Sequence, residues 1–351
     1  WGSDGHWLEQ GGSMNVDIHG HVSAPQSLMV YQAGLIASRG AHGRGGVHAT
    51  VEQVRESHLR PLPNWSNLSH LQHLEEGGID CQLLSPRPFT LMHSEQPPTI
   101  VRWFCEETND IIALACEAFP DRFRGVCGLP QGAGTEPAEW VGELRRCVND
   151  LGFVGGMLNP DPYEGTGSPP GMSDRWWYPI YEAACELDVP LLVHSASCKP
   201  PARESYTLHF ITEETINVID VVNSELLSDF PTLKLIFSHG GGAIPYQAGR
   251  FMSRASGSGE RFIDRLRRVY FDTCLYTRDA LELLIKTVGP DRCLFGTEKP
   301  GTGTQRDENG RWYDDVLGKL DEIEWLSKDD REAVLSGNAR AIFKLGALVP
   351  S

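Results

Sequence analysis

The chain lacks the cysteine spacing of a disulfide-stabilised or zinc-ribbon protein. It contains nine cysteines, an odd number, and no two of them form a Cys-x-x-Cys pair. Several lie inside apolar segments, for example Cys127 and Cys293, which favours buried free thiols in a reducing compartment. The sequence also has no apolar run long enough to span a membrane and no charged-then-apolar leader at its start. We therefore expect a cytoplasmic protein with no membrane partner.

Basic residues are scarce relative to acidic ones. The chain has 31 Lys and Arg against 47 Asp and Glu, which gives a formal net charge of −16. Nucleic-acid binding requires clustered positive charge, so the composition argues against that class of function. A small anionic substrate is still compatible with this charge if the site supplies a local cation or a metal ion.

No internal repeat, low-complexity segment or linker divides the chain. Hydrophobic residues make up 40% of it and charged residues 22%, a composition that can bury a full core. Residues 1–13, which include His6 and end in Gly-Gly-Ser, show no periodicity and are interpreted as a tag remnant or a disordered arm. Residues 14–351 are predicted to form a single domain.

Eight short apolar runs alternate with amphipathic segments. The runs are predicted to be strands at residues 15–21, 79–86, 123–130, 153–160, 189–195, 233–240, 269–274 and 293–298. Their apolar and small residues suit strands buried on both faces of a parallel sheet. Between them, helical segments such as 100–119 and 216–230 repeat apolar residues at three- and four-residue spacing. This alternation predicts an α/β fold, a (β/α)8 TIM barrel, with an insertion at 22–67 after the first strand.

Polar residues interrupt the apolar runs where the predicted strands end. His19 and His21 end the first strand, and the fifth, sixth and eighth end at His194, His239 and Glu298. Barrel enzymes place their catalytic groups at the C-terminal ends of the strands. Residues two apart on a strand face the same side, so His19 and His21 can bind one ion. Imidazoles with one carboxylate suit zinc, and also manganese or iron, with a coordination position open for water or substrate.

Each of these residues alone also has a structural interpretation, because a single histidine near a strand end more often forms a hydrogen bond than ligates a metal. Their joint position at strand ends favours the metal site. Asp17 and Asp272 receive no role from the sequence. The remaining histidines lie in predicted loops or helices and are expected to be mostly solvated: His42, His48, His58, His70, His73, His93 and His209.

The run HGGGAIPYQAGR at 239–250 is a candidate substrate-binding segment. Glycines such as Gly241 let the backbone approach a ligand or a metal closely. The helix that follows would favour an anion at its N-terminus. Arg250 on that helix, with a surface ion pair as its alternative interpretation, and Arg44 in the insertion are candidate substrate-binding residues.

Three motifs together resemble the amidohydrolase-2 family. They are HGH at the first strand, VH at the fifth and SHGGGAIPYQAGR at the sixth, and the closing GNARAIFKL resembles the final helix of the family. The resemblance extends from about Asn15 to Leu345 and implies the distorted barrel of that family. The family includes aminocarboxymuconate semialdehyde decarboxylase, aromatic-acid decarboxylases and 4-oxalomesaconate hydratase.

The resemblance implies roles for individual residues. His19, His21 and His194 match the histidine metal ligands of the family, and His239 matches the histidine that acts as acid and base or orients water. Arg250 matches an arginine that a partner subunit supplies to a substrate carboxylate, which implies a homodimer or a dimer of dimers.

One position separates the branches of the family. The decarboxylases carry Asp after the eighth strand, whereas this chain has Glu298 in LFGTEKP, which resembles the hydratase branch. The later GRWYDDV at 310–316 also resembles that branch, while Lys299-Pro300 departs from its pattern.

These features imply a metal-dependent lyase. The first hypothesis is a hydratase of an unsaturated oxo-di- or tricarboxylate from aromatic ring cleavage, with His239 and Glu298 as catalytic residues and Glu298 also able to ligate the metal. The alternatives are a nonoxidative decarboxylase of an aromatic or muconate-type acid, an amide or lactone hydrolase, and a non-catalytic barrel. The three reactions share the same ligands, so the sequence leaves them open, whereas the intact ligand set argues against the non-catalytic barrel.

Overall fold

The strands of the chain form one continuous parallel sheet. The computed structural model describes residues 14–62, 66–200, 206–255 and 259–346, so the arm predicted at 1–13 lies outside the described residues. Within those ranges the strands are β1 (Val16–His21), β2 (Cys81–Ser85), β3 (Phe123–Gly128), β4 (Gly155–Leu158), β5 (Leu191–Val193), β6 (Leu235–Phe237), β7 (Tyr270–Asp272) and β8 (Cys293–Leu294). Each pairs in parallel with the next in sequence order.

Backbone hydrogen bonds join the last strand to the first. The amide of Ile18 donates to the carbonyl of Phe295 at 2.9 Å, and the amide of Glu298 donates to the carbonyl of His19 at 2.8 Å. These bonds place the end of the β8 segment along β1 and close the barrel. The predicted TIM barrel is therefore confirmed. Its distortion is visible in the two-residue β8 and in the register shift between Asp17 and Gly20.

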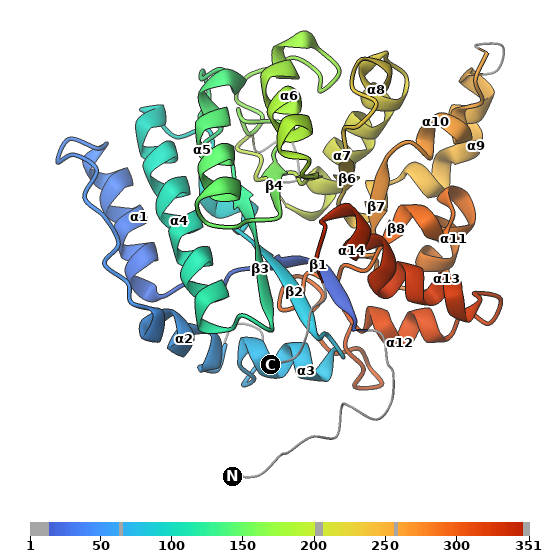
Figure 1. Ribbon diagram of the computed structural model, residues 1–351, viewed down its shortest axis with the longest axis horizontal. Coiled ribbons are helices and arrows are strands. Elements are labelled where there is room, and N and C mark those ends of the chain that lie inside the picture. Colours follow the sequence, from blue (N-terminus) through green and yellow to red (C-terminus); the bar gives the residue numbers. More distant parts are fainter. Residues whose placement is uncertain (1–13, 63–65, 201–205, 256–258, 347–351) are drawn as a thin grey trace.

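Helices surround the strands on the outside of the barrel (Figure 1). In the described residues they are α1 (Gln26–Ser38), α2 (Val51–Leu59), α3 (His70–Glu76), α4 (Pro98–Ala118), α5 (Pro137–Asn149), α6 (Tyr178–Leu187), α7 (Thr207–Val222), α8 (Leu226–Asp229), α9 (Ile244–Ala255), α10 (Phe262–Leu266), α11 (Arg278–Val288), α12 (Val316–Asp321), α13 (Lys328–Glu332) and α14 (Asn338–Ile342). None of these described helices is long and apolar enough to cross a membrane.

The insertion predicted after the first strand is confirmed as helices α1 and α2, which pack against α4. Helix α2 begins with a capping box, in which the side chains of Thr50 and Gln53 each accept a hydrogen bond from the backbone amide of the other. Ser69 and Gln72 form the same arrangement at the start of α3. These local signals start the last helix of the insertion, α2, and the short helix α3 that connects the insertion to β2.

The helix predicted at 216–230 is two helices in the structure. Helix α7 ends at Val222, and α8 begins at Leu226. Ser224 lies between them, and its hydroxyl donates to the carbonyl of Val221 at 2.8 Å and accepts from the amide of Leu226 at 3.2 Å. A serine side chain that bonds the local backbone competes with the helical hydrogen bonds, which explains the break.

Five histidines that we predicted to be solvated are buried instead: His58, His70, His73, His93 and His209. That prediction is wrong because their segments pack against the barrel. Nε2 of His70 lies 2.9 Å from Oε1 of Gln82 on β2, and the ring of His58 stacks on His70 at 5.0 Å. His42 and His48 are exposed, as predicted.

Candidate active site

Four histidines meet inside one end of the barrel. His19 and His21 are on β1, His194 directly follows β5, and His239 lies two residues after β6. The ring of His194 lies 4.9 Å from that of His19, 5.5 Å from that of His21 and 4.9 Å from that of His239. The strand-end positions recognised in the sequence are therefore brought together by the fold.

Three of these rings could hold a metal ion. His19, His21 and His194 each offer a nitrogen, and the three nitrogens lie within 4.8 Å of one another. Nε2 of each ring is buried without a hydrogen-bond partner. Burial lowers the pKa of His21 and of His194 well below the usual value, and the neighbouring histidines lower it further. Imidazole nitrogens that are buried without a hydrogen-bond partner fit a divalent cation such as zinc.

The opposite nitrogen of each ring is held by the protein. Nδ1 of His19 lies 2.6 Å from Oδ2 of Asp272, which is fully buried at the end of β7. Nδ1 of the other two rings lies 3.0 Å from the Ser85 hydroxyl and 2.7 Å from the Ser195 carbonyl oxygen. An acceptor at Nδ1 places the proton there and leaves the Nε2 lone pair for a metal.

Glu298 lies beside this cluster. Its Oε1 is 4.0 Å from Nε2 of His21, and its Oε2 accepts a hydrogen bond from the Tyr276 hydroxyl at 3.0 Å. The residue is 5% exposed and has a left-handed backbone conformation, with φ 58°. Such a conformation is costly for a non-glycine residue and is concentrated at functional sites. The carboxylate is within reach of an ion held by the histidines.

His239 is paired with a carboxylate that the sequence did not reveal. Its Nδ1 donates to both oxygens of Glu214, at 3.0 and 2.9 Å, and Glu214 is fully buried on α7. Burial lowers the pKa of His239, but the charge and hydrogen bonds of Glu214 outweigh it and raise the pKa to about 10. A second group of possible ligands joins His239 to His19 and Cys274. The three-histidine group is the better candidate, because each of its rings has a buried Nε2 without a hydrogen-bond partner in the described residues.

The glycines of the HGGG run allow close packing under the cluster. His239 has φ 49° and begins a short 3-10 turn, His239–Gly241. Gly241 has φ 72°, and a Cβ there would lie 2.7 Å from the ring of Phe271. At Gly242 a Cβ would lie 2.4 Å from the carbonyl oxygen of Ile211. Side chains are excluded at both glycines, so the run positions His239 and keeps the backbone close to the site.

The two candidate arginines lie outside the histidine cluster. Arg44 forms ion pairs with Glu106 and, at 3.4 Å, with Glu107 of α4. Arg250 is exposed on α9. Within one chain, neither of them contacts the histidines in the described residues, so their substrate-binding roles remain predictions.

The loop after β8 is fixed by a buried ion pair. Nζ of Lys299 lies 2.7 Å from Oδ1 of Asp314, and both side chains are fully buried. The ammonium group also lies 4.7 Å from the ring centre of Trp312. The Lys299-Pro300 departure and the GRWYDDV segment are therefore in contact with one another, directly beyond Glu298.

Three supporting residues were missed or left without a role in the sequence: Asp272, Glu214 and Tyr276. Asp272 ends β7, so the strand-end criterion that found the histidines could also have found it. Glu214 lies in a helix with other acidic residues, and Tyr276 lies in a loop, so neither has a local signal.

Comparisons with known proteins agree with this architecture. The sequence model of the amidohydrolase family (Amidohydro_2) matches residues 16–345. The 2-keto-4-carboxy-3-hexenedioate hydratase of a Sphingobium species is 37% identical over 336 residues, which cover 94% of this chain and 96% of that protein.

Solved structures show the same barrel. The 4-oxalomesaconate hydratase from Rhodopseudomonas palustris aligns with a TM-score of 0.83 and 30% identity, over 94% of this chain and 96% of that one. A dihydroxybenzoic acid decarboxylase from a Polaromonas species, with bound manganese and the inhibitor 2-nitroresorcinol, aligns with a TM-score of 0.70 and 23% identity, over 95% and 98%. The resemblance inferred from the motifs is confirmed, and the chain belongs to the amidohydrolase-2 family.

Proposed function

We propose that this chain is a metal-dependent hydratase that adds water to an unsaturated oxo-di- or tricarboxylate. The observation that carries the proposal is Glu298, held by Tyr276 beside His21 where the decarboxylases are expected to have aspartate. Similarity to a 2-keto-4-carboxy-3-hexenedioate hydratase over 94% of the chain supports the same reaction.

The metal would be held by His19, His21 and His194, with Glu298 as a further ligand or a close neighbour. Zinc suits three imidazoles and a carboxylate, and manganese or iron also suits this set. The manganese bound to the Polaromonas decarboxylase shows that this fold accepts such an ion. A divalent ion supplies Lewis-acid activation of water or of a substrate oxygen.

The protein's own groups account for the proton transfers. As the water oxygen bonds to the β-carbon of the conjugated alkene, Glu298 accepts a proton from that water. The electron pair of the double bond moves into the enolate, and Glu298 then returns the proton to the α-carbon. His239, held by Glu214, keeps its proton and stabilises the negative charge of the enolate by a hydrogen bond. The single product has the composition of the substrate plus one water molecule.

Substrate binding completes the proposal. Gly241 lets the backbone approach the substrate, and Arg250 acts from a partner subunit of a homodimer or a dimer of dimers. Arg44 is kept as a candidate, although forming a substrate contact requires it to leave Glu106 and Glu107.

The test is product analysis with 2-keto-4-carboxy-3-hexenedioate and the zinc- or manganese-loaded protein. We expect loss of the conjugated absorbance and a product that contains one oxygen from labelled water, with no CO2 released. Chelator-treated protein is the control and should be inactive. Release of CO2 from this or a dihydroxybenzoate substrate would replace the hydratase with a decarboxylase, and turnover of amides or lactones alone would replace it with a hydrolase.

A further inference from the structure

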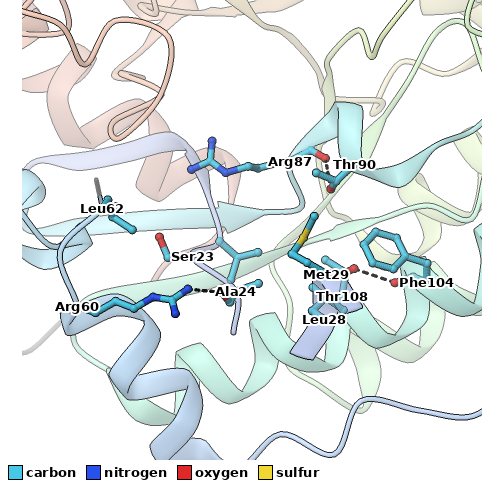
Figure 2. Close-up of a pocket in the computed structure, with 11 residues that line it drawn as sticks. Ser23, Ala24, Leu28, Met29, Arg60, Leu62, Arg87, Thr90, Phe104 and Thr108 are labelled. Carbon is cyan, nitrogen blue, oxygen red and sulfur yellow. Dashed lines mark hydrogen bonds between the residues drawn. The ribbon is translucent and has the colours of Figure 1, made fainter. Parts of the chain in front are cut away.

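A cavity of about 260 Å³ is lined in part by the residues that directly follow the candidate ligand His21 in the chain. Val22, the residue after His21, lies in its wall. Ser23 and Ala24 line the cavity as well (Figure 2). Helices α1 and α4 contribute apolar side chains that include Leu28, Met29 and Phe104. The cavity therefore adjoins the segment that follows the end of β1, where His21 lies.

Two arginines line the same cavity, Arg60 and Arg87. Figure 2 shows Arg87 on one side of Ser23 and Arg60 on the other. Arg60 follows α2, where its Nη2 lies 3.5 Å from the carbonyl oxygen of Ala24. Arg87 lies two residues beyond the C-terminal end of β2, which is the end of the strand where barrel enzymes place their active sites.

Arg87 reaches over the end of β1. Its Nη2 donates to the carbonyl oxygen of Pro300 at 3.1 Å, and Pro300 is two residues after Glu298. Because β1 lies between β2 and the β8 segment in the barrel, a side chain that joins those two loops passes the end of β1, where His21 lies.

The charge balance of the site calls for such a cation. Glu298 and Asp272 place two carboxyl groups around the candidate metal ligands, and a third, Glu214, is paired with His239. A substrate with two or three carboxylates needs positive charge beyond one metal ion. Arg87 is half-buried, and a guanidinium group in that setting forms strong paired hydrogen bonds with a carboxylate.

We propose that Arg87 binds a substrate carboxylate remote from the reacting double bond, and that the cavity holds the carbon chain bearing it. This inference rests on the proposed function and narrows its substrate class to polycarboxylates with an aliphatic arm. Arg87 is then a specificity-determining residue, because its contact distinguishes substrates by the number of their carboxylates and not by the bond that reacts.

A purely structural role for Arg87 is the competing explanation, since its bond to Pro300 also fixes the loop after β8. A structural role would change the binding of all ligands alike. The carboxylate-binding role would change the preference among them. The informative quantity is therefore the ratio between the affinities for a ligand with more carboxylates and for one with fewer.

The experiment uses metal-loaded protein and two saturated probes, propane-1,2,3-tricarboxylate and glutarate, measured by calorimetry. We expect wild type to bind the tricarboxylate more tightly. Arg87→Met should weaken tricarboxylate binding by about 10- to 100-fold and glutarate binding much less. The tricarboxylate affinity of Arg87→Lys should lie between those of wild type and Arg87→Met. Arg278→Met, at an ion-paired arginine on α11, is the matched control and should bind like wild type.

The outcomes separate this inference from the proposed function. Equal loss for both probes, an unchanged ratio in Arg87→Met and Arg87→Lys, or no preference in wild type overturns the role of Arg87. If wild type prefers the tricarboxylate and Arg87→Met loses that preference, but wild type hydrates no substrate, the hydratase is overturned and the carboxylate site stands. Metal content and thermal unfolding of each variant show that the comparison is made on folded, loaded protein.

Discussion

Nδ1 of His19 lies 2.6 Å from Oδ2 of Asp272, and both side chains are fully buried. Asp272 also accepts hydrogen bonds from the amides of Gly240 and Cys274, each at 3.1 Å. Burial raises the pKa of Asp272, but the hydrogen bond and charge of His19 outweigh it, so the net pKa is lowered. An ionised Asp272 therefore orients the His19 ring and holds a proton on its Nδ1, which leaves Nε2 to act as the ligand.

We predict that Asp272→Asn weakens metal binding by about 10- to 100-fold, because the amide cannot replace the charged acceptor. The measurement is a competitive chelator titration of the purified variant. Asp279→Asn, at an exposed aspartate on α11, is the control and should bind metal like wild type. Unchanged affinity in Asp272→Asn would contradict the ligand role of His19.

The sequence predicted the part of this site that is local in the chain. The site histidines stand at the ends of apolar strands, and a parallel barrel necessarily brings strand ends together. The contacts that orient them are not local, because Asp272 lies 253 residues from His19 in the sequence. Glu214 lies on α7, where an acidic residue is ordinarily solvated, so only the fold shows that it faces His239.

The burial of the other histidines was also not predictable from the local sequence. His58 and His70 read as polar residues of short helices, yet both are buried because α2 and α3 pack against neighbouring elements. Amphipathic periodicity is weak in helices of nine and seven residues, so the buried face was not recognisable.

We predict that Tyr276→Phe lowers kcat about tenfold while metal content stays at the wild-type level. The Tyr276 hydroxyl donates to Oε2 of Glu298 at 3.0 Å, and without it the carboxylate can rotate away from its working position. Steady-state kinetics on the authentic substrate and metal analysis test this. Tyr313→Phe, at a residue that is 44% exposed, is the control. A wild-type kcat in Tyr276→Phe would remove Tyr276 from the site.

We predict that the free energy of unfolding falls as the pH decreases from about 6.5 to about 4. Burial lowers the pKa of His58 from 6.5 to about 4. In that window the unfolded chain binds a proton at this histidine and the folded chain does not, so stability present above pH 6.5 is lost as the pH falls. The contribution of one such group is up to about 3 kcal/mol.

Urea unfolding at pH 7.5 and pH 5 measures this loss. His58→Phe keeps an aromatic ring against His70 and removes the titrating group, so its stability should fall less between the two pH values. His42→Phe, at an exposed histidine, is the matched control. An identical loss in wild type and His58→Phe would show that His58 is not the source.

We predict a homodimer in which Arg250 acts in the site of the partner subunit. Arg250 is exposed on α9 and does not reach the histidines of its own chain. Arg250→Met and Glu298→Gln should each lose turnover as separate proteins. When equal amounts of the two variants exchange subunits, about half of the dimers are heterodimers, and one of the two sites in each heterodimer has both residues intact. The mixture should therefore recover roughly one quarter of wild-type activity. No recovery, or an active monomer at micromolar concentration in analytical ultracentrifugation, would contradict this arrangement.

We predict that Glu298→Gln lowers kcat by about 10²- to 10⁴-fold while the protein stays folded and keeps its metal. The carboxylate lies 4.0 Å from Nε2 of His21 and accepts a hydrogen bond from Tyr276, so it is beside the candidate metal site and a protein group holds it there. Glutamate is one methylene longer than the aspartate expected in the decarboxylases, which lets it move a proton between water and the α-carbon. Glutamine preserves its size and removes that capacity.

The variant must be measured for kcat and metal content together, because the two roles of Glu298 predict different results. Loss of both would reduce Glu298 to a ligand, and near-normal turnover would refute any catalytic role. Loss of turnover with retained metal assigns the proton transfer to Glu298. Glu298→Asp then separates the effect of side-chain length from the effect of charge, because it keeps the carboxylate and removes one methylene. If proton transfer depends on the extra methylene, kcat should remain low in this variant as well.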